Sequence, residues 1–144
     1  MFRVTRRYTF AASHRLDSRR LTPAQNRELY GKCNNPYGHG HNYVVEVSAR
    51  GPLDPLTQRA VDTAALDRLV TGEVLDHLDH RNLNTEVPAF AQAVPTSENL
   101  AAEIGRRLKR QWPSVFPGPW PRLEKIRIAE TPRNIFEVIA DELE

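Results

Sequence analysis

The segment CNNPYGHGHNY, residues 33–43, concentrates side chains that can bind a metal or move a proton. It holds Cys33, the only cysteine of the chain, and His39 and His41, two of its five histidines. Neutral imidazoles and thiolates are ligands that zinc prefers, and a thiol near a cation is a competent base. The segment also fits an ordinary loop rich in turn-forming residues, so the flanking elements must decide between the two interpretations.

The segments on either side of this loop alternate like strands that bury one face. In residues 2–14 the apolar side chains share one parity, and His14 ends that series. In residues 41–49 the apolar parity runs back to His41 and His39. Side chains two apart share a face, and the end of one antiparallel strand lies beside the start of the next. The three imidazoles should therefore converge, and an open fourth position would be typical of catalytic zinc.

Two further residues can be interpreted structurally or chemically. Cys33 has polar neighbours, and a nearby cation would lower its pKa towards neutrality. A buried free cysteine is otherwise an inert small hydrophobe. Glu130 shares the parity of the apolar residues in a strand expected at 123–130. A carboxylate on an apolar face is costly unless it is paired, and it could accept two hydrogen bonds from a nitrogen heterocycle. A solvated Glu130 beyond the strand is the alternative.

The run DHLDHRNL, residues 76–83, contains two adjacent pairs of aspartate and histidine. In either pair, Asp76 with His77 or Asp79 with His80, the carboxylate could orient and polarise an imidazole for proton transfer. Histidines at a helix C-terminus also interact favourably with the helix dipole without any chemistry. The residues by themselves do not select a pair.

The elements that must position these residues follow the order of two strands, two helices and two strands. This order indicates an α+β fold with an antiparallel sheet. One helix is expected from the N-cap Asp62 to about Leu78, and another from Thr96 or Ser97 to Pro113. Strands are expected at 2–14, 41–49, 123–130 and 134–140, with a long polar connection at 15–38.

The composition argues against several classes of protein. A chain of 144 residues suits a single domain with one core. The net charge of +2 is too small to argue for nucleic acid, and no apolar run approaches the roughly 18 residues of a membrane span. The N-terminal segment lacks the apolar region of a signal peptide, and one cysteine cannot form an intrachain disulfide. We therefore expect a cytoplasmic protein.

Five motifs can be read together: FAASHRL (10–16), YGKCNNPYGHGHNY (30–43), LDHRNLN (78–84), PTSEN (95–99) and IAET (128–131). With them the chain resembles the 6-pyruvoyltetrahydropterin synthase family over nearly its whole length. The resemblance implies a single catalytic domain over residues 1–144 with the tunnelling fold, a four-stranded antiparallel sheet with two helices in the order ββααββ. It also implies homo-oligomers, in which trimers form a barrel, pair into hexamers and place active sites at subunit interfaces.

The resemblance assigns catalytic and metal-binding roles. Cys33 matches the catalytic cysteine, and Asp79 and His80 match its partners in a proton relay, which leaves Asp76 and His77 outside the site. One zinc ion is implied per chain. Its matching ligands are His14, His39 and His41.

The same resemblance implies the substrate and its binding residues. Glu130 matches the glutamate that anchors the pterin ring, and Thr96, Ser97 and Glu98 match residues near the ring. Serine at 97 stands where threonine is expected, but it keeps the hydroxyl. The implied enzyme is a phosphorus–oxygen lyase that converts 7,8-dihydroneopterin triphosphate to 6-pyruvoyltetrahydropterin with zinc and eliminates triphosphate. Magnesium could accompany the triphosphate. No motif selects the basic residues that bind the triphosphate, for which Arg15, Arg19 and Lys32 are candidates.

Three alternatives stay open at this point. The 6-carboxytetrahydropterin synthases of the queuosine pathway use the same substrate and zinc and release acetaldehyde, with three residues between the cysteine and His-Gly-His. Here five residues, 34–38, intervene, as in the pyruvoyl type. A relative that makes a folate precursor has glutamate in place of the cysteine. A non-catalytic pterin-binding zinc protein would not need the set formed by Cys33, Asp79 and His80.

Overall fold

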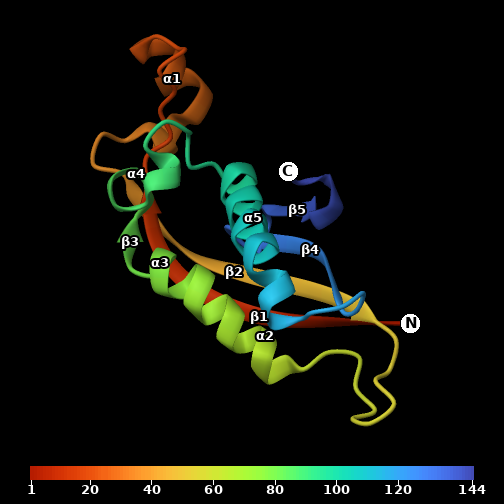
Figure 1. The fold of residues 1–144 in the computed structure, drawn as a ribbon. Coiled ribbons are helices and arrows are strands. Elements are labelled where there is room, and N and C mark those ends of the chain that lie inside the picture. Colours follow the sequence, from red (N-terminus) through yellow and green to blue (C-terminus); the bar gives the residue numbers. More distant parts are fainter.

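A five-stranded sheet with helices packed on one of its faces forms the body of the molecule (Figure 1). The computed structural model describes residues 1–144. The strand order is β3-β1-β2-β4-β5, and every neighbouring pair is antiparallel except β1 with β3. The strands are β1 (Phe2–His14), β2 (His39–Gly51), β3 (Arg81–Asn82), β4 (Arg122–Ala129) and β5 (Ile135–Ile139).

The α+β class and the four long strands agree with the sequence pattern, but the prediction of a four-stranded sheet is wrong. The fifth strand, β3, pairs in parallel with the end of β1, through Ala12 with Arg81 and Ser13 with Asn82. Two residues are too few to show the alternation by which a strand is detected in a sequence. This short strand brings the DHRN segment to the sheet edge beside the end of β1.

The first predicted helix follows its expected course. Asp62 accepts a hydrogen bond from the Ala65 amide at the start of α2 (Thr63–Val70). The helical segment continues through a π-helical turn, Thr71–Leu75, into α3 (Asp76–Leu78), so it ends where the pattern predicts. The face formed by Ala65, Leu66, Leu69, Val70, Val74 and Leu78 is buried.

The second predicted helix, α5 (Ser97–Val115), begins after Thr96, whose hydroxyl accepts a hydrogen bond from the Asn99 amide. The prediction that Pro113 stops this helix is wrong by two residues. A proline near the end of a helix removes one amide donor, while the buried rings of Trp112 and Phe116 pack 4.7 Å apart across it. None of the helices combines the length and apolar character that a membrane crossing requires.

The connection at 15–38, expected to be irregular, contains the short helix α1 (Pro23–Tyr30), which projects from one end of the sheet (Figure 1). Thr22 and Gln25 form a capping box, with the Thr22 hydroxyl accepting from the Gln25 amide and the Gln25 side chain accepting from the Thr22 amide. The pattern Thr-Pro-x-Gln could have revealed this helix. It lacks the apolar stripe that periodicity detects, because Asn26 is its only buried residue.

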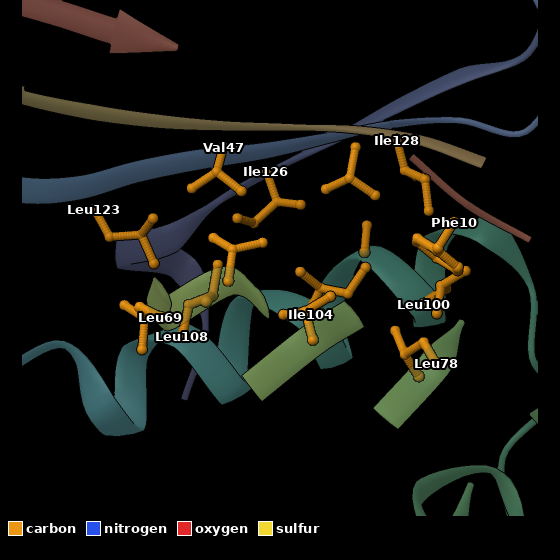
Figure 2. Close-up of a cluster of buried hydrophobic side chains, with 14 of the residues drawn as sticks. Phe10, Val47, Leu69, Leu78, Leu100, Ile104, Leu108, Leu123, Ile126 and Ile128 are labelled. Carbon is orange, nitrogen blue, oxygen red and sulfur yellow. The ribbon is translucent and has the colours of Figure 1, made fainter. Parts of the chain in front are cut away.

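The hydrophobic core lies between the sheet and the helices α2 and α5 (Figure 2). Leu100, Ile104 and Leu108 of α5 are fully buried against Val47 and Ile126 of the sheet, as their spacing predicts. Burying one such side chain contributes about 1.5–3 kcal/mol. This packing fixes the end of β1, the start of β2 and the end of β4 relative to one another.

Candidate active site

The three histidines expected to share a face lie together at the end of the sheet. In the antiparallel register of β1 and β2, His14 is opposite His39, and Ala12 is opposite His41. The centroids of the three rings lie 4.6–5.1 Å apart. The Nε2 atoms of His39 and His41 are 2.8 Å apart. The two periodicities of the sequence thus place three imidazoles at one point.

The surroundings of His14 prepare its Nε2 atom to be a metal ligand. Its Nδ1 atom lies 2.8 Å from the Pro95 carbonyl oxygen, which can only accept, so Nδ1 carries the proton. Nε2 is then a lone-pair donor, and it is buried without a hydrogen-bond partner. Burial lowers the pKa of His14 and of His39, which favours the neutral form that binds metals. An orphaned lone pair beside two further imidazoles fits a divalent cation.

A thiol and a carboxylate adjoin these imidazoles. The ligand atoms of His14, Cys33 and His39 all lie within 4.8 Å of one another, and so do those of His14, His41 and Glu130. One Glu130 carboxylate oxygen lies 3.4 Å from His41 Nε2 and 3.7 Å from His14 Nε2. The Glu130 side chain is 14% exposed, so it continues the buried face of β4 instead of entering solvent.

Cys33 is held by hydrogen bonds to the segment that follows His14. Its carbonyl accepts from the Leu16 amide at 2.7 Å. The buried Asn34 side chain donates to the Leu16 carbonyl at 2.8 Å and to the Asp17 carboxylate at 2.9 Å. Burial and the Glu130 carboxylate raise the pKa of the thiol, an effect that a cation at the imidazoles would oppose. Nothing in the sequence sets Asn34 apart from Asn35.

Asp79 and His80 lie just beyond α3, at the edge of the sheet. Asp79 accepts a hydrogen bond from the Ala11 amide at 2.9 Å, and its carboxylate lies 3.0 Å from His80 Nδ1. These contacts, the first of them most strongly, lower the pKa of Asp79. His80 is 82% exposed, and its φ of +60° places it in the left-handed region. No hydrogen bond joins either residue to Cys33 within the chain.

The other Asp-His pair is differently placed. Asp76 and His77 lie on α3 with exposed side chains, and neither makes a side-chain hydrogen bond or ion pair. The structure therefore distinguishes two pairs that the sequence pattern left equivalent, because only Asp79 is tied to the sheet.

The segment at the start of α5 contacts the imidazoles through Pro95, whose carbonyl holds His14. Of the three residues expected near a pterin, Thr96 caps the helix and Glu98 is exposed. Ser97 is buried, and its hydroxyl has no hydrogen-bond partner.

Asn84 holds the backbone directly after His14. Its side chain accepts from the Arg15 amide at 2.7 Å and donates to the Arg15 carbonyl at 2.9 Å. The two bonds fix the path of the chain as it leaves β1, directly after His14. Asn84 ends the LDHRNLN motif, and that membership is the only sign of its role in the sequence.

Gly38 lies in the turn that precedes His39, where both the backbone conformation and the available space require glycine. Its φ is +74°, and a Cβ atom there would lie 2.9 Å from the His14 carbonyl oxygen. We expect Gly38→Ala to lower the free energy of unfolding by about 1–3 kcal/mol. Gly40→Ala is the matched control, because its Cβ would lie at an ordinary 3.7 Å from the Ala12 carbonyl oxygen. Urea unfolding measures both, and equal losses would contradict the close approach at Gly38.

Comparison with known proteins places this geometry in a family. Residues 3–141 match the family model of 6-pyruvoyl tetrahydropterin synthase. The 6-pyruvoyl tetrahydrobiopterin synthases of Poecilia reticulata and Homo sapiens are 46% and 42% identical to the chain, covering 92% of it and 86% and 87% of their own lengths. The solved structure of Caenorhabditis elegans 6-pyruvoyl tetrahydropterin synthase superposes with a TM-score of 0.86 at 43% identity, over 96% of this chain and 94% of that one. The chain therefore belongs to the 6-pyruvoyl tetrahydropterin synthase family of enzymes.

Proposed function

We propose that this protein converts 7,8-dihydroneopterin triphosphate to 6-pyruvoyltetrahydropterin and eliminates triphosphate. The observation that carries the proposal is the meeting of three imidazoles with one thiol and one carboxylate at the end of the sheet. A reaction that moves several protons needs such groups around one substrate. Relatives of 42–46% identity that are named for this type of enzyme support the same conclusion.

The proposed metal is one zinc ion per chain, held by His14, His39 and His41. When bound, zinc supplies Lewis-acid polarisation of the oxygen atoms of the substrate side chain. Magnesium, where it takes part, accompanies the triphosphate. No redox cofactor is needed, because one part of the substrate is oxidised while another is reduced.

The thiol and the carboxylate have separate roles in this proposal. The Glu130 carboxylate accepts hydrogen bonds from the ring of the pterin and fixes its orientation. Thr96, Ser97 and Glu98 complete the ring site, with the free Ser97 hydroxyl as a polar contact. Cys33, as a thiolate, then takes a proton from the side chain of the substrate and returns it at another atom.

Asp79 and His80 are proposed to relay protons with the Cys33 thiol of a neighbouring subunit. In support, the pair is tied to the sheet edge and its imidazole faces solvent, where a second chain can meet it. The assembly proposed is a trimer with a barrel, paired into a hexamer. Residues 1–144 would act as one catalytic domain in the cytoplasm.

The principal alternative is cleavage of the side chain to give the 6-carboxy product with acetaldehyde. The five residues 34–38 between the cysteine and His39 favour the pyruvoyl product, because this spacer sets where the thiol lies relative to the imidazoles. We expect an anaerobic reaction of the zinc-loaded protein to release triphosphate without acetaldehyde, as mass spectrometry can determine. A dominant 6-carboxytetrahydropterin peak with matching acetaldehyde would establish the alternative. Absence of any turnover would favour a pterin-binding protein without activity.

A further inference from the structure

A large hollow lies beside the metal-binding residues, on the side where α1 projects from the sheet. Its volume is about 820 Å³. Its walls include Arg15 and Gly38, which are the chain neighbours of His14 and His39, and Pro95, whose carbonyl holds the His14 ring. The hollow therefore adjoins the site through the same backbone segments that position two of its imidazoles.

The hollow is strongly basic for its size. Arg15, Arg19 and Arg20 line it, and Asp17 is its only acidic residue, which gives an excess of two positive charges. The whole chain of 144 residues carries a net charge of only +2. A basic concavity of this kind attracts anions and concentrates them locally.

The three guanidinium groups differ in the partners that they already have within the chain. Arg15 donates to the Asn34 carbonyl and lies 3.5 Å from the Asp17 carboxylate. Arg19 donates to the neutral side chain of Gln92, which also lines the hollow, at 3.1 Å. The exposed Arg20 side chain has no hydrogen bond or ion pair within the chain. Arg19 and Arg20 therefore keep their full charge for a ligand, whereas Arg15 is partly committed.

We propose that Arg19 and Arg20 bind the triphosphate of the substrate in this hollow. The inference rests on the proposed function, which places the oxygen-bearing side chain of the substrate at the imidazoles and thus its triphosphate close to them. Guanidinium groups bind phosphate oxygens through paired, charge-assisted hydrogen bonds. Lys32, a candidate from the sequence, does not line the hollow, and Arg20 takes its place in the proposal.

The test compares a double variant, Arg19→Glu with Arg20→Glu, with a control that changes the net charge equally. The control is Arg106→Glu with Arg110→Glu, on the exposed side of α5 and outside the hollow. Neopterin, neopterin triphosphate and inorganic tripolyphosphate are titrated into each protein by calorimetry at one fixed ionic strength. Unfolding curves establish that every variant is folded.

In the wild type we expect neopterin triphosphate to bind more tightly than neopterin. The double variant should lose roughly tenfold or more in affinity for the two triphosphate compounds and keep its affinity for neopterin. The control should resemble the wild type. An unchanged preference for triphosphate in the double variant, or an equal loss in the control, would overturn the inference.

The failure of the proposed function has a different signature. A wild type that binds neopterin, with no gain from the triphosphate, would overturn the anion site and leave the pterin site standing. A wild type that binds tripolyphosphate but neither pterin would overturn the proposed function, and a loss of that binding in the double variant would still support the anion site.

Discussion

Replacing Cys33 with alanine should leave a folded protein that binds zinc and turns over roughly 10²–10⁴-fold more slowly. The expected loss is that of a positioned acid–base group. The Cys33 thiol lies beside the imidazoles and the Glu130 carboxylate, where a proton can pass between it and a bound substrate. The measurement is the steady-state release of triphosphate, with zinc content and thermal unfolding determined on the same sample.

Asn35→Ala is a suitable control for this variant, because Asn35 lies two residues away in the same loop. Its exposed side chain makes one hydrogen bond, accepted from the Tyr37 amide, so the control also measures the effect of loosening the loop. Its turnover should stay close to that of the wild type. A loss of less than about threefold in Cys33→Ala would show that water or another residue supplies the base. Equal losses in both variants would point to a disturbed loop instead of a missing proton carrier.

Replacing His39 with alanine should lower the affinity for zinc by more than roughly 100-fold, because loss of a direct ligand exceeds the usual effect of losing a supporting residue. Purified wild-type protein should contain close to one zinc ion per chain, and the variant should contain very little. His14→Ala and His41→Ala should behave alike. Elemental analysis after exhaustive dialysis measures the metal directly, without reference to activity.

His77→Ala is the matched control for the metal experiment, since His77 is an exposed histidine of α3 away from the three rings. It should keep its zinc. The Cys33 thiol belongs to a competing ligand set with His14 and His39. If Cys33→Ala lost zinc while His41→Ala retained it, the metal would be bound by that set, and the assignment of three histidines would be wrong.

The tertiary structure differs from the elements expected from the sequence where a segment has no hydrophobic periodicity or where a helix continues past a proline. The two residues of β3 show no alternation, and α1 is nearly all exposed, so neither leaves a hydrophobic signal. Pro113 lies inside α5 because the packing of Trp112 against Phe116 continues beyond it. A contact between distant residues decided β3, the lack of a buried face hid α1, and a local contact four residues apart accompanies the extension of α5 past Pro113.

The sequence by itself determined the long strands, the two core helices and the meeting of three histidines. Alternation along β1 and β2 assigns His14, His39 and His41 to one face, and antiparallel pairing brings the ends of these strands together. Glu130 shares the strand parity of the buried residues Ile126 and Ile128, and its carboxylate accordingly lies beside the imidazoles. These results follow from the two-residue alternation of side chains along a strand, which can be seen in the order of residues alone.

Only the tertiary structure decided how the site is oriented and what surrounds it. The Pro95 carbonyl that fixes the proton on His14, and the Asn84 side chain that holds Arg15, act across more than 60 positions of sequence. Backbone carbonyls are the same at every residue, so residue types cannot reveal which one will accept a given hydrogen bond. The pairing of Asp79 with the β1 backbone and the basic hollow beside the imidazoles arise in the same way, from segments that meet only when the core has packed.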